Sequence, residues 1–171
     1  MNSQLAILAI VDVEAVQNTG TLIGNCNLID NNRVRGSSGE GSGQLVTHVE
    51  GSQIVNWLVL PADIFNGGSS PYITKIGGEA VDKGIMVPRV FESPEFGSLG
   101  IWWGANVTTN HEGLYHYTLT FNVGGKEMDF ISSIYAKPAF SNYEPQPETE
   151  GLHAANAGQF RIHRSITPQK S

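Results

Sequence analysis

Nine stretches of the chain alternate between hydrophobic and polar residues over the length of a strand. Successive side chains of a strand point to opposite faces of a sheet, so this pattern predicts strands with one buried face. The stretches are 4–14, 20–29, 44–50, 54–60, 72–80, 84–91, 99–108, 114–123 and 126–136. Turn residues such as Asn66-Gly67-Gly68 separate them, and no amphipathic helix longer than a turn or two is evident. The sequence therefore predicts an all-β, single-domain antiparallel β-sandwich of about eight or nine strands, Greek-key or jelly-roll-like, with little or no helix.

The pattern divides the chain into a β-sandwich domain, residues 4–138, and a C-terminal extension, residues 139–171. The extension begins with a polar, acidic stretch at 141–150, and alternation returns at 159–166. Two interpretations stay open. The extension is either a disordered tail or a tail with one extra strand at 159–166, paired with this domain or with a neighbouring chain.

Gly124-Gly125 predicts a two-residue hairpin turn, because both central positions of a type I′ turn need a positive φ. Pairing Val123 with Lys126 gives the hairpin one apolar face and one mainly polar face, whereas a slip of one residue would mix them. The apolar pairs are Phe121/Met128, Leu119/Phe130 and Tyr117/Ser132, and the others are Asn122/Glu127, Thr120/Asp129 and Thr118/Ile131.

The adjacent residues Trp102 and Trp103 must point to opposite faces if 99–108 is a strand. A three-residue loop, His111-Glu112-Gly113, would match the apolar positions of 99–108 to those of 114–123. Trp103 then lies opposite Phe121 in the core. Trp102 lies on the other face, beside Asn122, Glu127, Thr120 and Asp129.

An exposed indole bordered by amides and carboxylates suits a sugar, which has an apolar C–H face and a ring of hydroxyls. The candidate ligand-binding residues are Trp102, Asn122, Glu127, Thr120 and Asp129. Two other interpretations of Trp102 remain open. The indole is covered by a loop or tail of its own chain, or it lies in an interface between subunits.

Composition excludes several classes of function. A formal net charge of −6 and a pI of about 5.3 argue against nucleic acid as a partner. Cys26, the single cysteine, allows no internal disulfide and is expected to be a small buried residue. The chain shows neither an apolar run of roughly 20 residues, as a membrane span needs, nor a basic leader. We expect no membrane span and a cytoplasmic location.

No motif of catalysis or metal binding is complete. In His111-Glu112-Gly113-Leu114-Tyr115-His116, the second histidine comes one residue too late for a zinc-protease helix, and the segment reads as a hairpin. The glycine-rich stretch 31–43 precedes a strand rather than a helix, which argues against a phosphate-binding loop. Asp12, Glu14, Asp30 and Asp129 lack the spacing of a calcium loop. We expect no enzyme activity, no cofactor and no metal.

Several motifs, in order, resemble the bacterial PixA/AidA family of inclusion-body proteins over about residues 4–137. They are Ile10-Val11-Asp12-Val13-Glu14, Ile54-Val55-Asn56-Trp57-Leu58-Val59, Trp102-Trp103-Gly104-Ala105-Asn106-Val107, Gly113-Leu114-Tyr115-His116-Tyr117 and Phe121-Asn122-Val123-Gly124-Gly125-Lys126. The chain departs from the family pattern at Gln17-Asn18-Thr19-Gly20 and at Ser132-Ser133-Ile134-Tyr135.

The resemblance implies a small bacterial protein. Some members of that family accumulate as intracellular crystalline inclusions, and others are under quorum-sensing control. It supplies no catalytic residues. Together with the Trp102 face, it leads us to expect a non-enzymatic, lectin-like sandwich that binds a glycan and self-associates as a homo-oligomer. The expected location is the cytoplasm or intracellular inclusions, with release from the cell left open. The alternative is a storage or self-assembly protein without a small-molecule ligand.

Overall fold

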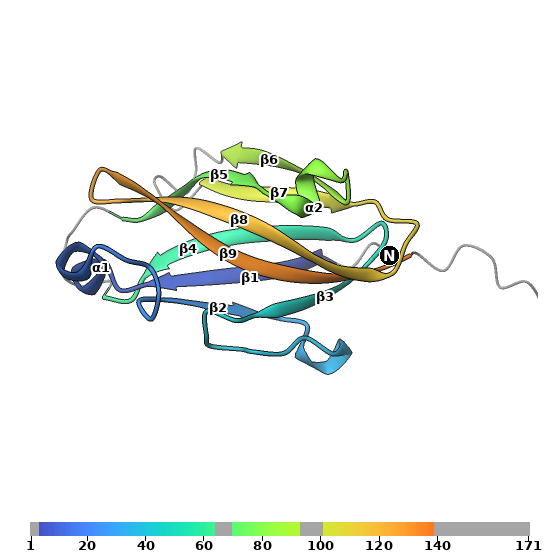
Figure 1. The fold of residues 1–171 in the computed structure, drawn as a ribbon, viewed down its shortest axis with the longest axis horizontal. Helices are drawn as coiled ribbons and strands as arrows, with labels where there is room; N and C mark the ends of the chain where they lie inside the picture. The colour runs from blue at the N-terminus through green and yellow to red at the C-terminus, as the bar shows by residue number, and fades with distance from the viewer. Residues whose placement is uncertain (1–3, 64–69, 93–100, 139–171) are drawn as a thin grey trace, which may run out of the picture. The chain divides into compact units, whose positions relative to one another are not determined.

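The structure is a computed structural model that describes residues 4–63, 70–92 and 101–138. The predicted extension, 139–171, with its alternating segment 159–166, lies outside the described residues. The described part is mostly β-structure (Figure 1). Its strands are β1 (Gln4–Val11), β2 (Cys26–Asp30), β3 (Val46–Glu50), β4 (Ile54–Pro61), β5 (Tyr72–Gly77), β6 (Met86–Glu92), β7 (Ile101–Val107), β8 (Gly113–Val123) and β9 (Lys126–Lys137). Each of the nine predicted stretches overlaps one of these strands.

The strands form two sheets. Sheet A has the order β2-β1-β4-β7-β6, and sheet B has the order β3-β9-β8-β5. The prediction of a purely antiparallel arrangement is wrong, because β1 pairs with β4, and β3 with β9, in parallel. Alternation of side chains carries no information about strand direction. The nearly continuous apolar run of β1 is nevertheless typical of a parallel strand in the middle of a sheet.

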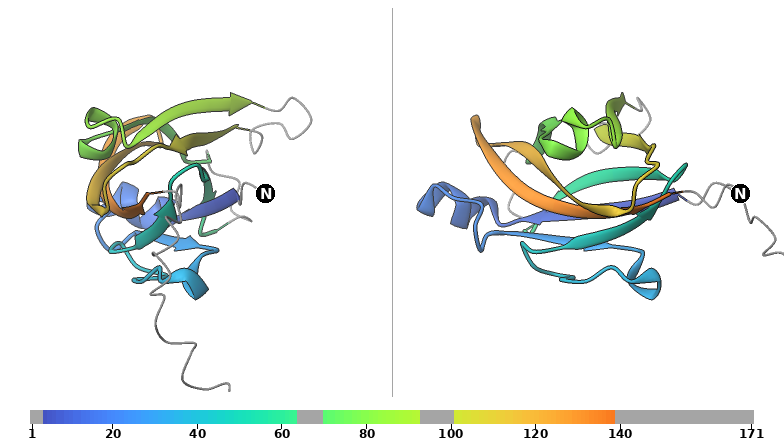
Figure 2. Two further views of the ribbon diagram at one scale, coloured as in Figure 1. Left: turned by 90° about the vertical axis from the view of Figure 1, so that its right-hand side faces the viewer. Right: turned by 45° about the vertical axis from the view of Figure 1, so that its right-hand side comes forward.

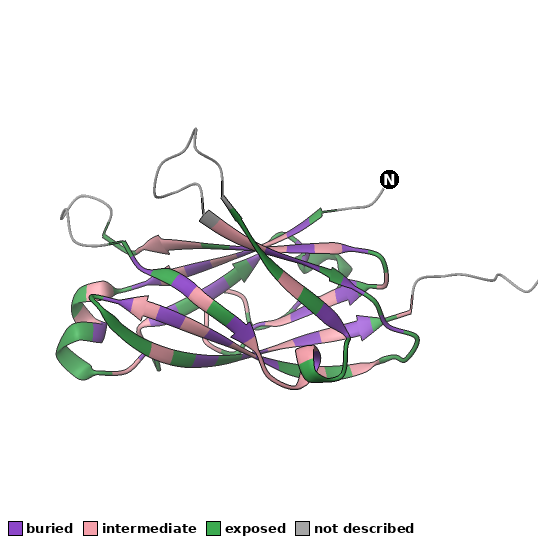
Figure 3. Cartoon of the chain, turned by 90° about the horizontal axis from the view of Figure 1, so that it is seen from above, coloured by how far each residue is buried: buried purple, intermediate pink, exposed green. Residues whose placement is uncertain are grey.

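The two sheets face each other across one hydrophobic core in a sandwich-like arrangement (Figure 2). Burial alternates along the strands, as Figure 3 shows, so each sheet turns one face inward. Trp57 of β4 and Tyr117 of β8 meet at this core with ring centroids 5.7 Å apart. The Trp57 indole N–H donates a hydrogen bond of 3.3 Å to the Tyr117 hydroxyl. Two large side chains are thus buried with their polar atoms paired.

The hairpin of β8 and β9 has the predicted register. Val123 pairs with Lys126, and every pair proposed from the sequence is present. Gly124 and Gly125 have φ values of 60° and 86°, as a type I′ turn requires. A local turn therefore sets the register of the longest strand pair.

The predicted hairpin of β7 with β8 is wrong. Trp103 of β7 lies between Trp57 and Val90 in sheet A, whereas Phe121 of β8 pairs with Met128 and Ile73 in sheet B. The segment between β7 and β8 carries the chain from one sheet to the other. Both sheets turn their apolar positions toward the same core. The apolar positions of β7 and β8 consequently match in both arrangements, whether the two strands pair in one sheet or face each other across the core.

Short helices replace the ends of two predicted strands. The helix α1 (Val13–Thr19) follows β1, because the Asp12 carboxylate accepts a hydrogen bond of 2.9 Å from the Ala15 N–H as an N-cap. Gly20 ends the helix in the left-handed conformation, with φ 72°. The other helical segments are η1 (Arg33–Arg35), a 3-10 turn, and α2 (Glu79–Asp82). None of the helices in the described ranges is long and apolar enough to cross a membrane.

The observed faces of the β8–β9 hairpin can be tested with a pair of truncations. Phe121 is 0% exposed and Ile131 is 65% exposed. We expect Phe121→Ala to lower the free energy of unfolding by about 3–5 kcal/mol, because it removes a buried ring and leaves a cavity. Ile131→Ala should change it by less than about 0.5 kcal/mol. Urea denaturation of both variants measures this difference, and equal losses would contradict the assignment of faces.

Candidate functional site

Trp102 and Trp103 point to opposite sides of sheet A, as the sequence predicts. Trp103 packs against the core, and its indole N–H donates a hydrogen bond of 2.9 Å to the carbonyl of Ile73 in sheet B. Trp102 lies on the outer face of sheet A, the face turned away from the core, together with Gly104 and Asn106. The outer face therefore carries one half-buried indole.

The register of sheet A shows which residues surround Trp102. Strand β7 lies between β4 and β6, so each outward residue of β7 has a neighbour on either side. The relevant pairs are Phe91/Trp102, Arg89/Gly104, Asn56/Gly104, Val87/Asn106 and Ile54/Asn106. These residues come from three strands, and none of the neighbours of Trp102 comes from β8 or β9.

Phe91 and Trp102 form an aromatic platform on the outer face. Their rings stack with centroids 5.8 Å apart and an interplanar angle of 14°. A Cβ atom at Gly104 would lie only 2.9 Å from the Phe91 ring and 3.1 Å from the Asn56 Oδ1 atom. The absence of a side chain at Gly104 therefore lets the Phe91 ring lie close to the backbone of β7.

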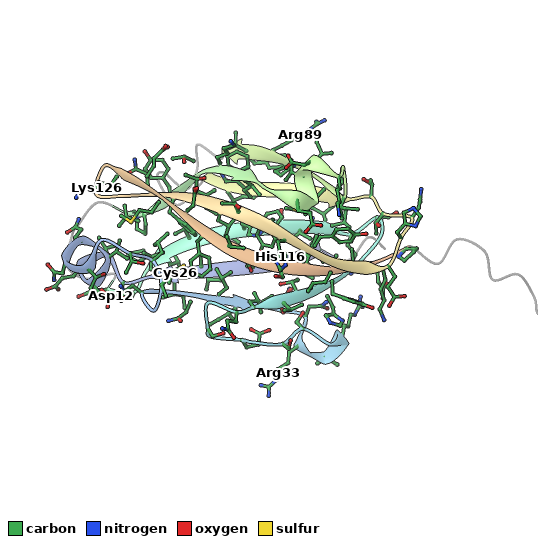
Figure 4. All side chains as sticks on the ribbon, in the orientation of Figure 1. Asp12, Cys26, Arg33, Arg89, His116 and Lys126 are labelled. Carbon is green, nitrogen blue, oxygen red and sulfur yellow. The ribbon has the colours of Figure 1, made fainter. Side chains whose placement is uncertain are left out.

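The aromatic platform is part of a groove of about 560 Å³, hereafter the β7 groove. This volume lies within the usual range for small-molecule sites. Its polar side chains are Gln4, Asn56, Arg89, Asn106 and Thr108, and its larger apolar ones are Ile54, Val87, Phe91 and Trp102. The Arg89 side chain extends outward from β6 (Figure 4). The β7 groove thus combines flat apolar surface with hydrogen-bonding groups.

The other four predicted ligand residues lie on the outer face of sheet B, so the predicted five-residue site is wrong. Thr120 donates a hydrogen bond of 2.7 Å to Asp129, and Asn122 accepts one of 3.1 Å from the Gly125 N–H. Glu127 is exposed and pairs with Asn122 across the hairpin. These side chains mainly serve the hairpin, and Trp102 has different neighbours.

Sequence reasoning missed Asn56, Arg89 and Phe91 as neighbours of Trp102. Each occupies an outward position in a predicted strand, so their orientation was readable from the alternation. The order of their strands in the sheet was not readable, because β4, β6 and β7 are separated in the sequence. Asn106 could have been identified from the sequence as part of the site, since it lies four residues after Trp102 on the same face of the same strand.

Cys26 is buried in β2, as predicted, and is 0% exposed. Burial raises the pKa of its thiol to about 12. The thiol therefore stays protonated at neutral pH and is a poor nucleophile.

Three of the four acidic residues considered as ligands for calcium have structural contacts instead, and the fourth, Glu14, is exposed. Asp12 caps α1, and Asp129 accepts from Thr120. Asp30 is buried, and its Oδ1 atom accepts a hydrogen bond of 2.7 Å from the Asn32 N–H. Within the described ranges, no group of three or more His, Cys, Asp or Glu side chains could hold a metal ion.

Asp30 and Glu40 form a carboxyl pair beside β2. The Asp30 N–H donates a hydrogen bond of 3.0 Å to Glu40 Oε2. Asp30 Oδ2 and Glu40 Oε1 are both buried, and neither has a hydrogen-bond partner among the described residues. Burial, followed by the contact with the Asp30 carboxyl group, raises the pKa of Glu40 above its ordinary value of 4.5.

A raised pKa of Glu40 makes stability depend on pH in a defined direction. The folded chain binds the Glu40 proton more tightly than the unfolded chain, so this contribution is fully present below pH 4.5 and is lost as the pH rises through the raised pKa. Glu40→Gln keeps the oxygen that accepts from Asp30 and removes the charge. We expect it to raise the melting temperature at pH 7 and to have a smaller effect at pH 4.

The matched control for this experiment is Glu127→Gln, since Glu127 is exposed on β9. Melting of both variants at the two pH values gives the comparison. The pH effect is refuted if Glu40→Gln and Glu127→Gln shift the melting temperature equally at pH 7.

Comparison with known proteins adds a family and a fold. A family model described as "Domain of unknown function (DUF8788)" matches residues 3–129. No curated protein matches the chain significantly. Among solved structures, the chain is similar to an inclusion body protein (PixA) from Burkholderia cenocepacia J2315. The TM-score is 0.57 at 12% sequence identity, over 80% of this chain and 95% of that chain. At this identity the likeness concerns the fold, which agrees with the resemblance seen in the motifs.

Proposed function

The chain belongs to the DUF8788 family, whose function is unknown, and we propose that it is a non-enzymatic, lectin-like protein that binds carbohydrate in the β7 groove. The observation that carries the proposal is the aromatic platform, Phe91 and Trp102, bordered by the amides of Asn56 and Asn106. The fold likeness to an inclusion body protein supports a non-enzymatic role in the cytoplasm or in intracellular inclusions.

The chemistry of the β7 groove matches the two kinds of surface on a sugar. A ring face made of C–H groups packs against an aromatic ring, because both surfaces are flat and apolar. Hydroxyl groups both donate and accept hydrogen bonds, and an asparagine amide offers a donor and an acceptor side by side. The Asn56 amide nitrogen lies 3.5 Å from the Leu5 carbonyl, and this contact does not involve the Oδ1 atom, which would accept from a sugar hydroxyl.

Trp102→Ala tests the binding site directly. We expect it to weaken glycan binding at least about tenfold, equivalent to about 1.4 kcal/mol, because the variant loses the larger ring of the platform. The wild type is first screened on a glycan array, and each hit is then measured by calorimetry with both proteins. Circular dichroism checks that the variant is folded.

Two controls separate the β7 groove from other surfaces. Tyr72→Ala removes a 47% exposed aromatic ring from β5 in sheet B. Glu127→Gln alters the site expected from the sequence. Neither of these two variants should change the affinity for the glycan. An array without hits would refute carbohydrate binding, and a loss with Tyr72→Ala but not with Trp102→Ala would move the site to sheet B.

A second observation favours self-association, with or without a glycan. Beyond the β7 groove, the outer face of sheet A is apolar along β1 and β4, at Leu8, Ile10, Leu58 and Leu60. Leu58 is exposed, the other three are partly buried, and contiguous apolar surface of this kind occurs at protein interfaces. We propose that a second copy of the chain covers this face. The same contact would serve the alternative role of storage or self-assembly.

Leu58→Glu tests this interface, because it puts a charge into the apolar face. Leu58 is 39% exposed in sheet A, and Leu114, the control, is 49% exposed in sheet B. We expect light scattering to give a mass above 18.5 kDa for the wild type and for Leu114→Glu, and a lower mass for Leu58→Glu. A wild type that stays at 18.5 kDa at every concentration would rule out self-association.

A further inference from the structure

We infer that the β7 groove selects a carbohydrate that carries a carboxylate, and that Arg89 binds this carboxylate. This inference rests on the proposed function and gives it a chemical class of ligand. It also separates Arg89, as the residue that determines specificity, from Trp102, which supplies general affinity for a sugar ring.

The first argument is the unpaired charge of Arg89. Arg89 is exposed, and within the described ranges its guanidinium takes part in no ion pair or hydrogen bond. The cations that are paired there, Lys83 and Lys137, lie next to Glu79 and Glu112, outside the β7 groove. Among the described residues, Arg33, Arg35, Lys75 and Lys126 form no ion pair either, so what distinguishes Arg89 is that its unpaired charge lines the β7 groove.

The second argument is the charge of the groove around Arg89. Among the residues that the structure describes, the lining includes amides, a threonine hydroxyl and apolar side chains, and none of these is acidic. A ligand carboxylate would therefore meet one positive charge and several neutral hydrogen-bond donors, with no repulsion from the lining. A cationic sugar would lack a counter-charge on this surface.

The third argument is the position of Arg89 in the sheet. Arg89 pairs with Gly104, and Gly104 pairs with Asn56 on its other side, so the three residues form one row across β6, β7 and β4. No side chain stands at the middle position. Phe91 lies two residues from Arg89 on the same face of β6 and stacks on Trp102. A sugar ring on the platform thus lies next to a row of residues that has a guanidinium at one end and an amide at the other.

The geometry of the guanidinium favours a carboxylate over a neutral hydroxyl. The guanidinium is planar, stays protonated, and presents parallel N–H donors that match the two oxygens of a carboxylate. A hydroxyl uses only one of these donors and leaves the charge unbalanced. A sulfate ester shares the negative charge but is tetrahedral, so a sulfated sugar is the relevant competitor.

The experiment compares sugars that carry an acidic group with related sugars that lack it. The probes are trigalacturonic acid beside its methyl ester, 3′-sialyllactose beside lactose, and a 6-sulfated galactoside beside the unmodified galactoside. Calorimetry measures each pair with the wild type, Arg89→Gln and Arg89→Lys. Arg33→Gln is the control, since Arg33 is an exposed arginine in η1 and does not line the β7 groove.

We expect the wild type to bind a carboxylated probe at least about tenfold more tightly than its neutral partner, and the preference to fall with rising salt. Arg89→Gln should remove the preference and keep the affinity for the neutral sugar, while Arg89→Lys should keep part of the preference. Arg33→Gln should behave like the wild type.

The remaining outcomes contradict different statements. Equal binding of acidic and neutral partners overturns the role of Arg89 and leaves carbohydrate binding in place. Tighter binding of the sulfated probe than of either carboxylated one overturns the carboxylate as the ligand group. Failure of every probe and of the glycan array overturns the proposed function together with this inference.

Discussion

The contact between Trp57 and Tyr117 joins the two sheets, and the arrangement of much of the remaining structure depends on it. Both rings are buried, and the Tyr117 hydroxyl accepts the hydrogen bond that satisfies the Trp57 indole N–H. Trp103 lies beside Trp57 in the register of sheet A, and its own N–H reaches sheet B at Ile73. With these two indoles directed inward, the alternation of β7 directs Trp102 outward. The place of the β7 groove is thus a consequence of how the core packs.

The outer face of sheet A carries two different surfaces next to each other. On the side of β6 and β7, amides and Arg89 surround the aromatic platform. On the side of β1 and β4, the outward side chains of Leu8, Ile10, Leu58 and Leu60 are aliphatic. Strand β4 belongs to both surfaces, since Asn56 borders the β7 groove and Leu58 belongs to the apolar surface. A second copy covering the apolar surface would therefore adjoin the β7 groove, so ligand binding and self-association would influence each other through this shared strand.

Gly104 shows how a single position serves the β7 groove without contributing a side chain. It lies at the centre of the row formed by Arg89 and Asn56, and the ring of Phe91 approaches its backbone. A larger residue there would displace the Phe91 ring, because the added Cβ would stand 2.9 Å from it. At this position the sheet backbone supplies the floor of the site, and the neighbouring polar groups, Arg89 and Asn56, come from the flanking strands. Sites built on paired strands hold such groups in fixed relative positions.

The sequence by itself determined which segments are strands, the register of the β8–β9 hairpin and the opposite orientations of Trp102 and Trp103. Each depends on local chemistry, namely period-two alternation or the positive φ of Gly124 and Gly125. Only the tertiary structure decided that β7 lies between β4 and β6, and therefore that Arg89, Phe91 and Asn56, rather than Asn122 and Glu127, surround Trp102. The physical reason is that an apolar face gains similar free energy from burial beside a neighbouring strand or across the core. Alternation thus shows on which face of a sheet a side chain lies, but it does not determine which residues are its neighbours.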